Sequence, residues 1–223
     1  MVKNKPVYAF EEADSKKRML LGGKGAGLSE MTRLKLPVPP GFTITTEVCN
    51  KYYDNNKKLP KDVMPAVMKN ITKMEKKTGK KWNSTKNPLL VSVRSGAAIS
   101  MPGMMDTILN LGLNDQTVLG LAKMTGNPRF AWDSYRRFIQ LFGKVVFGVN
   151  DEKFDHVLDT AKEKQGITDD SKLNVESLKI IVSEYKKICE EHTKRKFPDT
   201  PNEQLVLSIE AVFKSWMGER EIV

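Results

Sequence analysis

Two positively charged side chains lie beside glycines, a combination that suits the binding of phosphate. Lys24 is enclosed by glycines in the segment 20–28 (LLGGKGAGL), and Arg94 opens the segment 94–98 (RSGAA). Glycines allow backbone N–H groups to approach phosphate oxygens closely, while ammonium and guanidinium groups supply positive charge and hydrogen-bond donors. The two segments therefore predict a site for an oxyanion.

Neither segment matches a standard nucleotide-binding motif. The Walker A pattern is absent, and Glu30 occupies the position of the third glycine in a dinucleotide fingerprint that would start at Gly25 and Gly27. On local pattern alone, the glycines also suit a plain turn with a helix cap. Arg94 equally suits a surface position after a buried strand, so both interpretations stay open at this point.

A short strand is expected to carry Arg94. The alternation of Leu89, Val91 and Val93 predicts a strand that ends at this arginine. A second segment, 100–107 (SMPGMMDT), contains the turn signal Pro-Gly and flexible methionines, so it is predicted to be a flexible loop.

The glycine segment around Lys24 is predicted to form a loop between a strand and a helix. The strand is expected at Val7–Phe10. The helix is expected to place three apolar residues on one face, namely Leu28, Met31 and Leu34. A further strand is predicted in the segment 36–45 (LPVPPGFTIT), where Phe42 and Ile44 alternate with polar residues.

The rest of the chain, after Gly112, predicts helices. Four of their expected starts carry capping residues or proline, at Asn114, Asn127-Pro128, Asn174 and Thr200-Pro201, and a further helix is expected from about Glu152 to Gln165. In the helix that begins at Pro128, Arg136 and Arg137 fall opposite the apolar stripe. They are interpreted as part of a solvated face or a structural ion pair in preference to phosphate ligands.

Composition is that of a globular protein with one large domain or two small ones. The chain has 223 residues, 39% of them hydrophobic, and a mean hydropathy of −0.43. No apolar run approaches the roughly 20 residues of a membrane span, and the N-terminus lacks a signal-peptide core. Cys49 and Cys189 are predicted to be reduced and buried, and His156 and His192 to lie on the surface. These features predict a cytoplasmic protein without membrane contact, with an organelle as the open alternative.

The net charge of +10 raises the alternative of a nucleic-acid-binding module. Lysines cluster between Lys51 and Lys81, but apolar residues recur there at helical spacing, namely Met64, Val67, Met68, Ile71 and Met74. A solvated lysine face on an amphipathic helix therefore explains the cluster better.

Three segments together resemble the N-terminal nucleotide-binding domain of the pyruvate phosphate dikinase family. They are GGKGAGLSEM (22–31), LPVPPGFTIT (36–45) and VRSGAAISMPGMMDTILNLGLND (93–115), in this order and at this spacing. The related phosphoenolpyruvate synthases share the arginine and the small residues but diverge at MPGMMDT.

The resemblance implies an α+β fold, the first part of an ATP-grasp domain with a mixed sheet, flanking helices and an inserted helical subdomain. The expected divisions are an ATP-grasp subdomain at 1–113, a helical insertion at 114–198 and a return helix at 199–223. The chain would then be only the first part of a longer enzyme.

The activity that the resemblance implies is the reversible conversion of ATP, phosphate and pyruvate into AMP, pyrophosphate and phosphoenolpyruvate, a phosphotransferase reaction that passes through a phosphohistidine on another domain. The implied catalytic residues are Lys24 and Arg94. The implied nucleotide-binding residues are Gly22, Gly23, Gly25, Ser95, Met101, Gly103, Met104, Asp106 and Thr107. The cofactors would be ATP and Mg²⁺, with the magnesium ligands in the other half of the ATP-grasp domain and none in this chain.

The implied partners are the phosphohistidine domain and the phosphoenolpyruvate/pyruvate barrel of a full-length enzyme that forms homo-oligomers. This part alone is expected to be inactive. The alternatives are a phosphoenolpyruvate synthase-like or glucan dikinase-like phosphotransferase and, with charge as its only support, the nucleic-acid-binding module.

Overall fold

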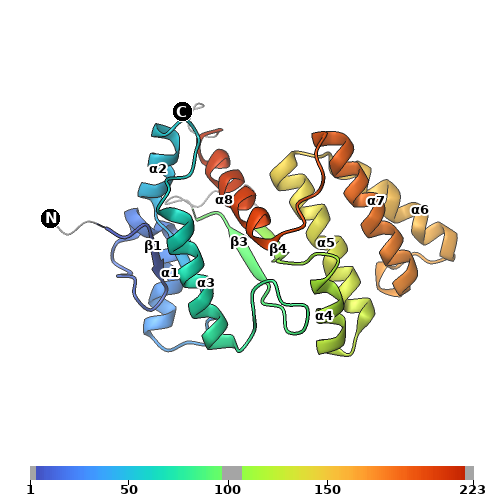
Figure 1. Cartoon of the computed structure of the whole chain (residues 1–223), viewed down its shortest axis with the longest axis horizontal. Coiled ribbons are helices and arrows are strands. Elements are labelled where there is room, and N and C mark those ends of the chain that lie inside the picture. The colour runs from blue at the N-terminus through green and yellow to red at the C-terminus, as the bar shows by residue number, and fades with distance from the viewer. Residues whose placement is uncertain (1–3, 97–106, 219–223) are drawn as a thin grey trace. The chain divides into compact units, whose positions relative to one another are not determined.

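The computed structural model describes residues 4–96 and 107–218, and the side chains among them as far as residue 215 (Figure 1). The chain divides into two compact units. Unit 1 comprises Met1–Lys80, Arg94–Asp106 and Val212–Val223, and unit 2 comprises Lys81–Val93 and Thr107–Ala211. The subdomain limits expected at residues 113 and 198 refer to a family fold and remain a prediction.

Unit 1 combines a two-stranded sheet with helices. Its elements are β1 (Val7–Ala9), α1 (Arg18–Arg33), β2 (Phe42–Ile44), α2 (Thr46–Asp54) and α3 (Val63–Thr78), together with the last part of α8 (Pro201–Gly218). β1 and β2 pair antiparallel, with Val7 opposite Ile44 and Ala9 opposite Phe42. Both strands lie where the sequence predicted them.

The core of unit 1 is partly aromatic. The ring of Tyr52, which is fully buried, lies 5.5 Å from the ring of Phe213 in α8. The hydroxyl of the neighbouring Tyr53 donates a hydrogen bond of 2.7 Å to the carbonyl oxygen of Phe213. These contacts fix the last part of α8 against α2.

Helix α3 is amphipathic as predicted, with Val63, Val67 and Ile71 buried. On its other side Lys73 pairs with Glu12 and Lys77 pairs with Glu11. The lysines thus form a largely exposed face that neutralises two nearby carboxylates, which weakens the case for a nucleic-acid surface.

Unit 2 contains a second two-stranded sheet and most of the helices. Its elements are β3 (Val91–Arg94, with Arg94 itself in unit 1), β4 (Thr107–Leu111), α4 (Thr117–Thr125), α5 (Pro128–Phe147), α6 (Asp151–Gln165), the 3₁₀ helix η1 (Asp170–Lys172), α7 (Val175–Thr193) and the first part of α8. β3 pairs with β4. α5 packs against α7 and α6, which also pack against each other (Figure 1).

Asparagine caps begin α5 and α7 where the sequence predicted them, whereas the N-cap of α4 is Gln116 and not the predicted Asn114. The side-chain oxygen of Asn127 accepts a hydrogen bond from the N–H of Phe130 (2.9 Å). The side-chain oxygen of Asn174 accepts one from Ser177 (2.9 Å). Each cap satisfies an N–H group that would otherwise lack an intrahelical partner.

Of the two predicted roles of Arg136, a place on a solvated face is excluded, because its side chain is only 2% exposed, and a structural ion pair is confirmed. Its guanidinium group donates to the carboxylate of Asp133 at 2.9 and 2.7 Å, and Asp170 lies 3.6 Å away. Burial alone would raise the pKa of Asp133, but hydrogen bonds and charge from Arg136 and Arg137 outweigh it and lower that pKa. Two carboxylates compensate the buried charge, so Arg136 belongs to a structural ion pair.

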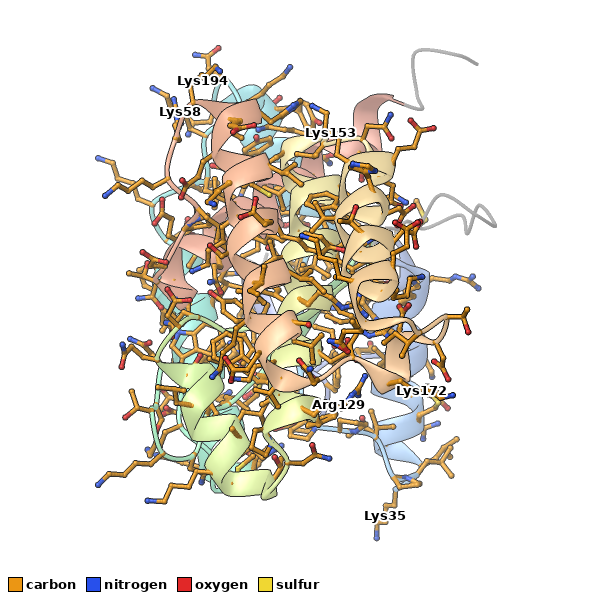
Figure 2. All side chains as sticks on the ribbon, turned by 90° about the vertical axis from the view of Figure 1, so that its right-hand side faces the viewer. Lys35, Lys58, Arg129, Lys153, Lys172 and Lys194 are labelled. Carbon is orange, nitrogen blue, oxygen red and sulfur yellow. The ribbon has the colours of Figure 1, made fainter. Side chains whose placement is uncertain are left out.

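The linker between α6 and α7 is held by Arg129, which lies with Lys172 near one end of these three helices (Figure 2). Arg129 donates to the main-chain carbonyl oxygens of Asp170 (2.7 Å) and Leu173 (3.0 Å). The first turn of α5 is thereby tied to η1 and to the residue that follows it.

The start of α8 is fixed by one buried amide, that of Gln204, which is 0% exposed. Its side-chain oxygen accepts from the N–H of Gly112 (3.1 Å), and its side-chain nitrogen donates to the carbonyl oxygens of Leu113 and Pro198, each at 3.0 Å. One side chain therefore satisfies main-chain groups from both the end of β4 and the approach to α8.

Gln204→Ala should lower the free energy of unfolding by about 3 kcal/mol, because each buried main-chain group left unpaired costs roughly 1–3 kcal/mol. Gln116→Ala is the matched control, since Gln116 is exposed on unit 2. Denaturant unfolding of both variants measures the difference. Equal midpoints would show that Gln204 does not hold this junction.

Candidate functional site

The glycine segment around Lys24 lies inside helix α1, which corrects the predicted loop. Only Gly22 departs from helical geometry, with φ 71° and ψ 167°, so two helical segments meet at a kink at this residue. Glycine reaches a positive φ without the steric cost that a side chain would bring. The expected loop is thus reduced to a single residue.

The buried face of α1 also differs from the predicted one. Met31 and Leu34 are 38% and 57% exposed, and the buried positions are mostly small residues, namely Leu21, Gly22, Gly25, Ala26 and Ser29. Small side chains allow the backbone of a helix to approach its neighbours closely. For this reason the small residues, and not the large apolar ones, face the interior of unit 1.

The kink in α1 lies directly against the segment that follows β3. A Cβ atom placed on Gly22 would be 1.8 Å from the carbonyl oxygen of Gly96, which is far inside van der Waals contact. A Cβ atom on Gly96 would in turn lie 3.8 Å from the Cβ of Lys24. The structure therefore brings together the two glycine segments that the sequence singled out.

Lys24 and Arg94 are close enough to affect each other electrostatically. The pKa of Lys24 is lowered, first by partial burial and second by the positive charge of Arg94. Within the described part of the chain, no carboxylate forms an ion pair with either side chain. Two neighbouring like charges repel each other, and a bound anion would relieve that repulsion.

Gly25 makes a close contact of a different kind. A Cβ atom on Gly25 would lie 2.8 Å from both Cγ2 and Oγ1 of Thr43 in β2. The carbonyl oxygen of Gly25 accepts a hydrogen bond from the hydroxyl of Ser29 at 2.8 Å. Gly25 therefore has a packing role in seating α1 on β2, and its assignment to a nucleotide stays a prediction.

The remaining predicted site residues are distributed as follows. Ser95 is 5% exposed beside Arg94, and Gly23 is half-buried in α1. Thr107 begins β4 and belongs to unit 2. The other members of the predicted loop lie outside the described residues, namely Met101, Gly103, Met104 and Asp106.

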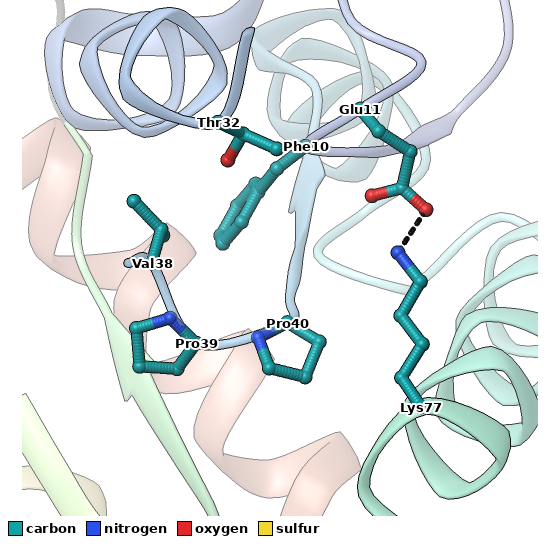
Figure 3. A pocket seen from close by; sticks show the side chains of 7 residues that line it. All are labelled: Phe10, Glu11, Thr32, Val38, Pro39, Pro40 and Lys77. Carbon is teal, nitrogen blue, oxygen red and sulfur yellow. Dashed lines mark hydrogen bonds and ion pairs between the residues drawn. The ribbon is translucent and has the colours of Figure 1, made fainter. Parts of the chain in front are cut away.

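Sequence reasoning missed a small pocket in unit 1 of about 170 Å³. Figure 3 shows the ring of Phe10 pointing into it, opposite Val38, Pro39 and Pro40, with the Glu11–Lys77 ion pair beside it. Its described lining includes neither Lys24 nor Arg94, so this pocket is distinct from the predicted phosphate site. Its lining comes from segments far apart in the sequence, and none of them carries a local pattern that would identify a pocket.

The described side chains also show no cluster of three or more histidine, cysteine, aspartate or glutamate residues that could hold a metal ion. None of the helices in the described ranges combines the length and the apolar character needed to cross a membrane.

A family model described as "Pyruvate phosphate dikinase, AMP/ATP-binding domain" matches residues 18–59 and 55–223. The chain belongs to this family. It is 54% identical over 216 residues to a pyruvate, phosphate dikinase of Entamoeba histolytica, covering 97% of this chain and 24% of the relative. It is 50% identical over 218 residues to that of Clostridium symbiosum, covering 97% and 25%.

A plant relative, pyruvate, phosphate dikinase 1, chloroplastic, of Arabidopsis thaliana, is 47% identical over 223 residues, covering 98% of this chain and 23% of the relative. The chain therefore spans about a quarter of the length of the curated relatives it matches.

Gly25→Ala should lower the free energy of unfolding by about 1–3 kcal/mol, because the added methyl group overpacks the contact with Thr43. Gly27→Ala is the matched control, since a Cβ atom there meets nothing within 4 Å. It should stabilise the helix by up to about 1 kcal/mol. Thermal or denaturant unfolding measures both.

A second substitution tests the cause of that destabilisation. Thr43→Ala should recover part of the stability lost in Gly25→Ala, because it removes the two atoms that a methyl group on Gly25 would meet. If the losses of the two variants simply add, the Thr43 contact is not what excludes a side chain at position 25.

Proposed function

We propose that this chain is the ATP-binding part of a pyruvate phosphate dikinase. The whole enzyme would convert ATP, phosphate and pyruvate into AMP, pyrophosphate and phosphoenolpyruvate, reversibly, through a phosphohistidine on another domain. The observation that carries the proposal is the contact of Gly22 with Gly96, which holds Lys24 near Arg94. The family description and the names of the relatives support it.

In this proposal Lys24 and Arg94 bind the β- and γ-phosphates of ATP. Their charges neutralise those of the phosphate oxygens and orient the transferred group in line with the attacking histidine, which is most of what phosphoryl transfer requires of a protein. The kink at Gly22 gives the helical segment 23–33 an N-terminal end of its own. Main-chain N–H groups at such an end favour a bound anion.

The finer assignments belong to the same proposal. Unit 1 would provide part of an ATP-grasp domain, and the helices α4 to α7 would be the inserted subdomain. Ser95 and the segment that contains Met101, Gly103, Met104, Asp106 and Thr107 would also contact the nucleotide. Magnesium would be held by residues outside this chain, and the phosphohistidine domain and the phosphoenolpyruvate/pyruvate barrel would be other parts of the longer protein.

The charged pair provides the test. In the full-length enzyme, Lys24→Met or Arg94→Leu should lower the rate at which ATP phosphorylates the histidine by roughly 100-fold or more, as expected when a preorganised charge is lost from a transition state. Transfer between phosphoenolpyruvate and the same histidine should continue, because it uses a different site. Single-turnover assays of the two half-reactions measure both rates.

Lys69→Met and Arg195→Leu are matched controls, since both side chains are exposed. They should leave both half-reactions unchanged. Lys24→Met should not lower the melting temperature, because it removes a repulsion from Arg94. A normal rate of phosphorylation from ATP in either site variant would contradict the proposal.

A further inference from the structure

The first turn of α1 is tied to the start of α2 by one hydroxyl group. The Oγ1 atom of Thr46 donates a hydrogen bond of 2.7 Å to the main-chain carbonyl oxygen of Met19. The side chain of Met19 is 78% exposed, so it contributes little packing of its own. The hydrogen bond from Thr46 is therefore a specific link between this turn and the rest of unit 1.

The segment of α1 that follows the kink at Gly22 packs on a second threonine, Thr43, three residues before Thr46 in the sequence. Thr43 in β2 lies under Gly25, within 2.8 Å of where a Cβ atom would be. Met19 precedes the kink at Gly22 and Gly25 follows it, so the two threonines contact α1 on both sides of the kink. We call Thr43 and Thr46 the threonine seat.

The threonine seat would act on the phosphate site indirectly, through the main chain of α1. Neither threonine needs to contact a ligand, but both contact the main chain within five residues of Lys24. Threonine is branched at Cβ and has few rotamers, so its contact atoms keep a defined position. A helix kinked at glycine has no strong preference of its own for one kink angle, and contacts on both of its arms can set that angle.

We propose that Thr43 and Thr46 are positioning residues that fix the kink at Gly22 and thereby the place of Lys24 next to Gly96 and Arg94. This inference rests on the proposed function, because it assigns the purpose of that position to the binding of ATP phosphates. Small displacements of a group that contacts the transferred phosphate have large effects on rate.

Thr46→Val tests the hydrogen bond, since it preserves the shape of the side chain and removes the donor. In the full-length enzyme it should lower kcat/KM for ATP in the histidine phosphorylation by roughly tenfold, in line with the cost of a small misplacement. The half-reaction with phosphoenolpyruvate and the melting temperature should change little. Thr46→Ser keeps the hydroxyl and should restore the ATP half-reaction to near its normal rate.

Thr72→Val is the matched control, because Thr72 is exposed and its hydroxyl bonds only within its own helix, to the carbonyl oxygen of Met68 (3.1 Å). It should leave both half-reactions unchanged. If Thr46→Val does not fold, Thr43→Ser replaces it, since that change removes one methyl group from the contact with Gly25 and carries the same expected result.

Lys24→Met, assayed beside these variants, distinguishes a failure of the proposed function from a failure of the positioning role of Thr43 and Thr46. If Lys24→Met keeps the ATP half-reaction, the proposed function fails. If Lys24→Met loses it but Thr46→Val behaves like Thr72→Val, the positioning role is overturned and the proposed function stands. Equal losses in both half-reactions of Thr46→Val, with a lower melting temperature, would also overturn it, because they would indicate a general structural role.

Discussion

The close approach of Gly22 to Gly96 is the constraint on which the candidate site depends. No side chain fits between the kink of α1 and the carbonyl oxygen of Gly96, where a Cβ atom would lie at 1.8 Å. Gly22 also needs a positive φ, so two independent requirements exclude other residues at this position. Because the two backbones touch, the side chains that flank them, Lys24 and Arg94, share one region of unit 1.

The proximity of the positively charged Lys24 and Arg94 is electrostatically unfavourable when no anion is bound. Partial burial and the charge of Arg94 both lower the pKa of Lys24, which means that its charged form is less stable here than in water. In contrast, the buried Arg136 of unit 2 is compensated by Asp133 and Asp170. Arg136 thus forms an ion pair that serves the fold, whereas Lys24 and Arg94 are two neighbouring cations, for which the proposed role is phosphate binding.

Main-chain groups in both units are held by single polar side chains. Gln204 joins the end of β4 to the start of α8, Arg129 joins α5 to η1, and Thr46 joins α2 to α1. Each side chain bonds to backbone carbonyl or N–H groups of a segment distant in sequence. Such bonds give these junctions a defined geometry by adding partners for main-chain groups near the ends of helices and strands.

Much of the local structure was determined by the sequence. Helix starts at Asn127 and Asn174, the strand that ends at Arg94 and the lysine face of α3 follow from capping, alternation and helical periodicity, which operate over a few neighbouring residues. Residue type likewise predicted a phosphate-binding role for Lys24 and Arg94, which stays a prediction. By contrast, only the tertiary structure decided that the glycine segment is a kinked helix, that Arg136 is buried and that Thr46 holds Met19. These features depend on which distant segments meet, and on the small residues that let their backbones touch, so no local pattern could encode them.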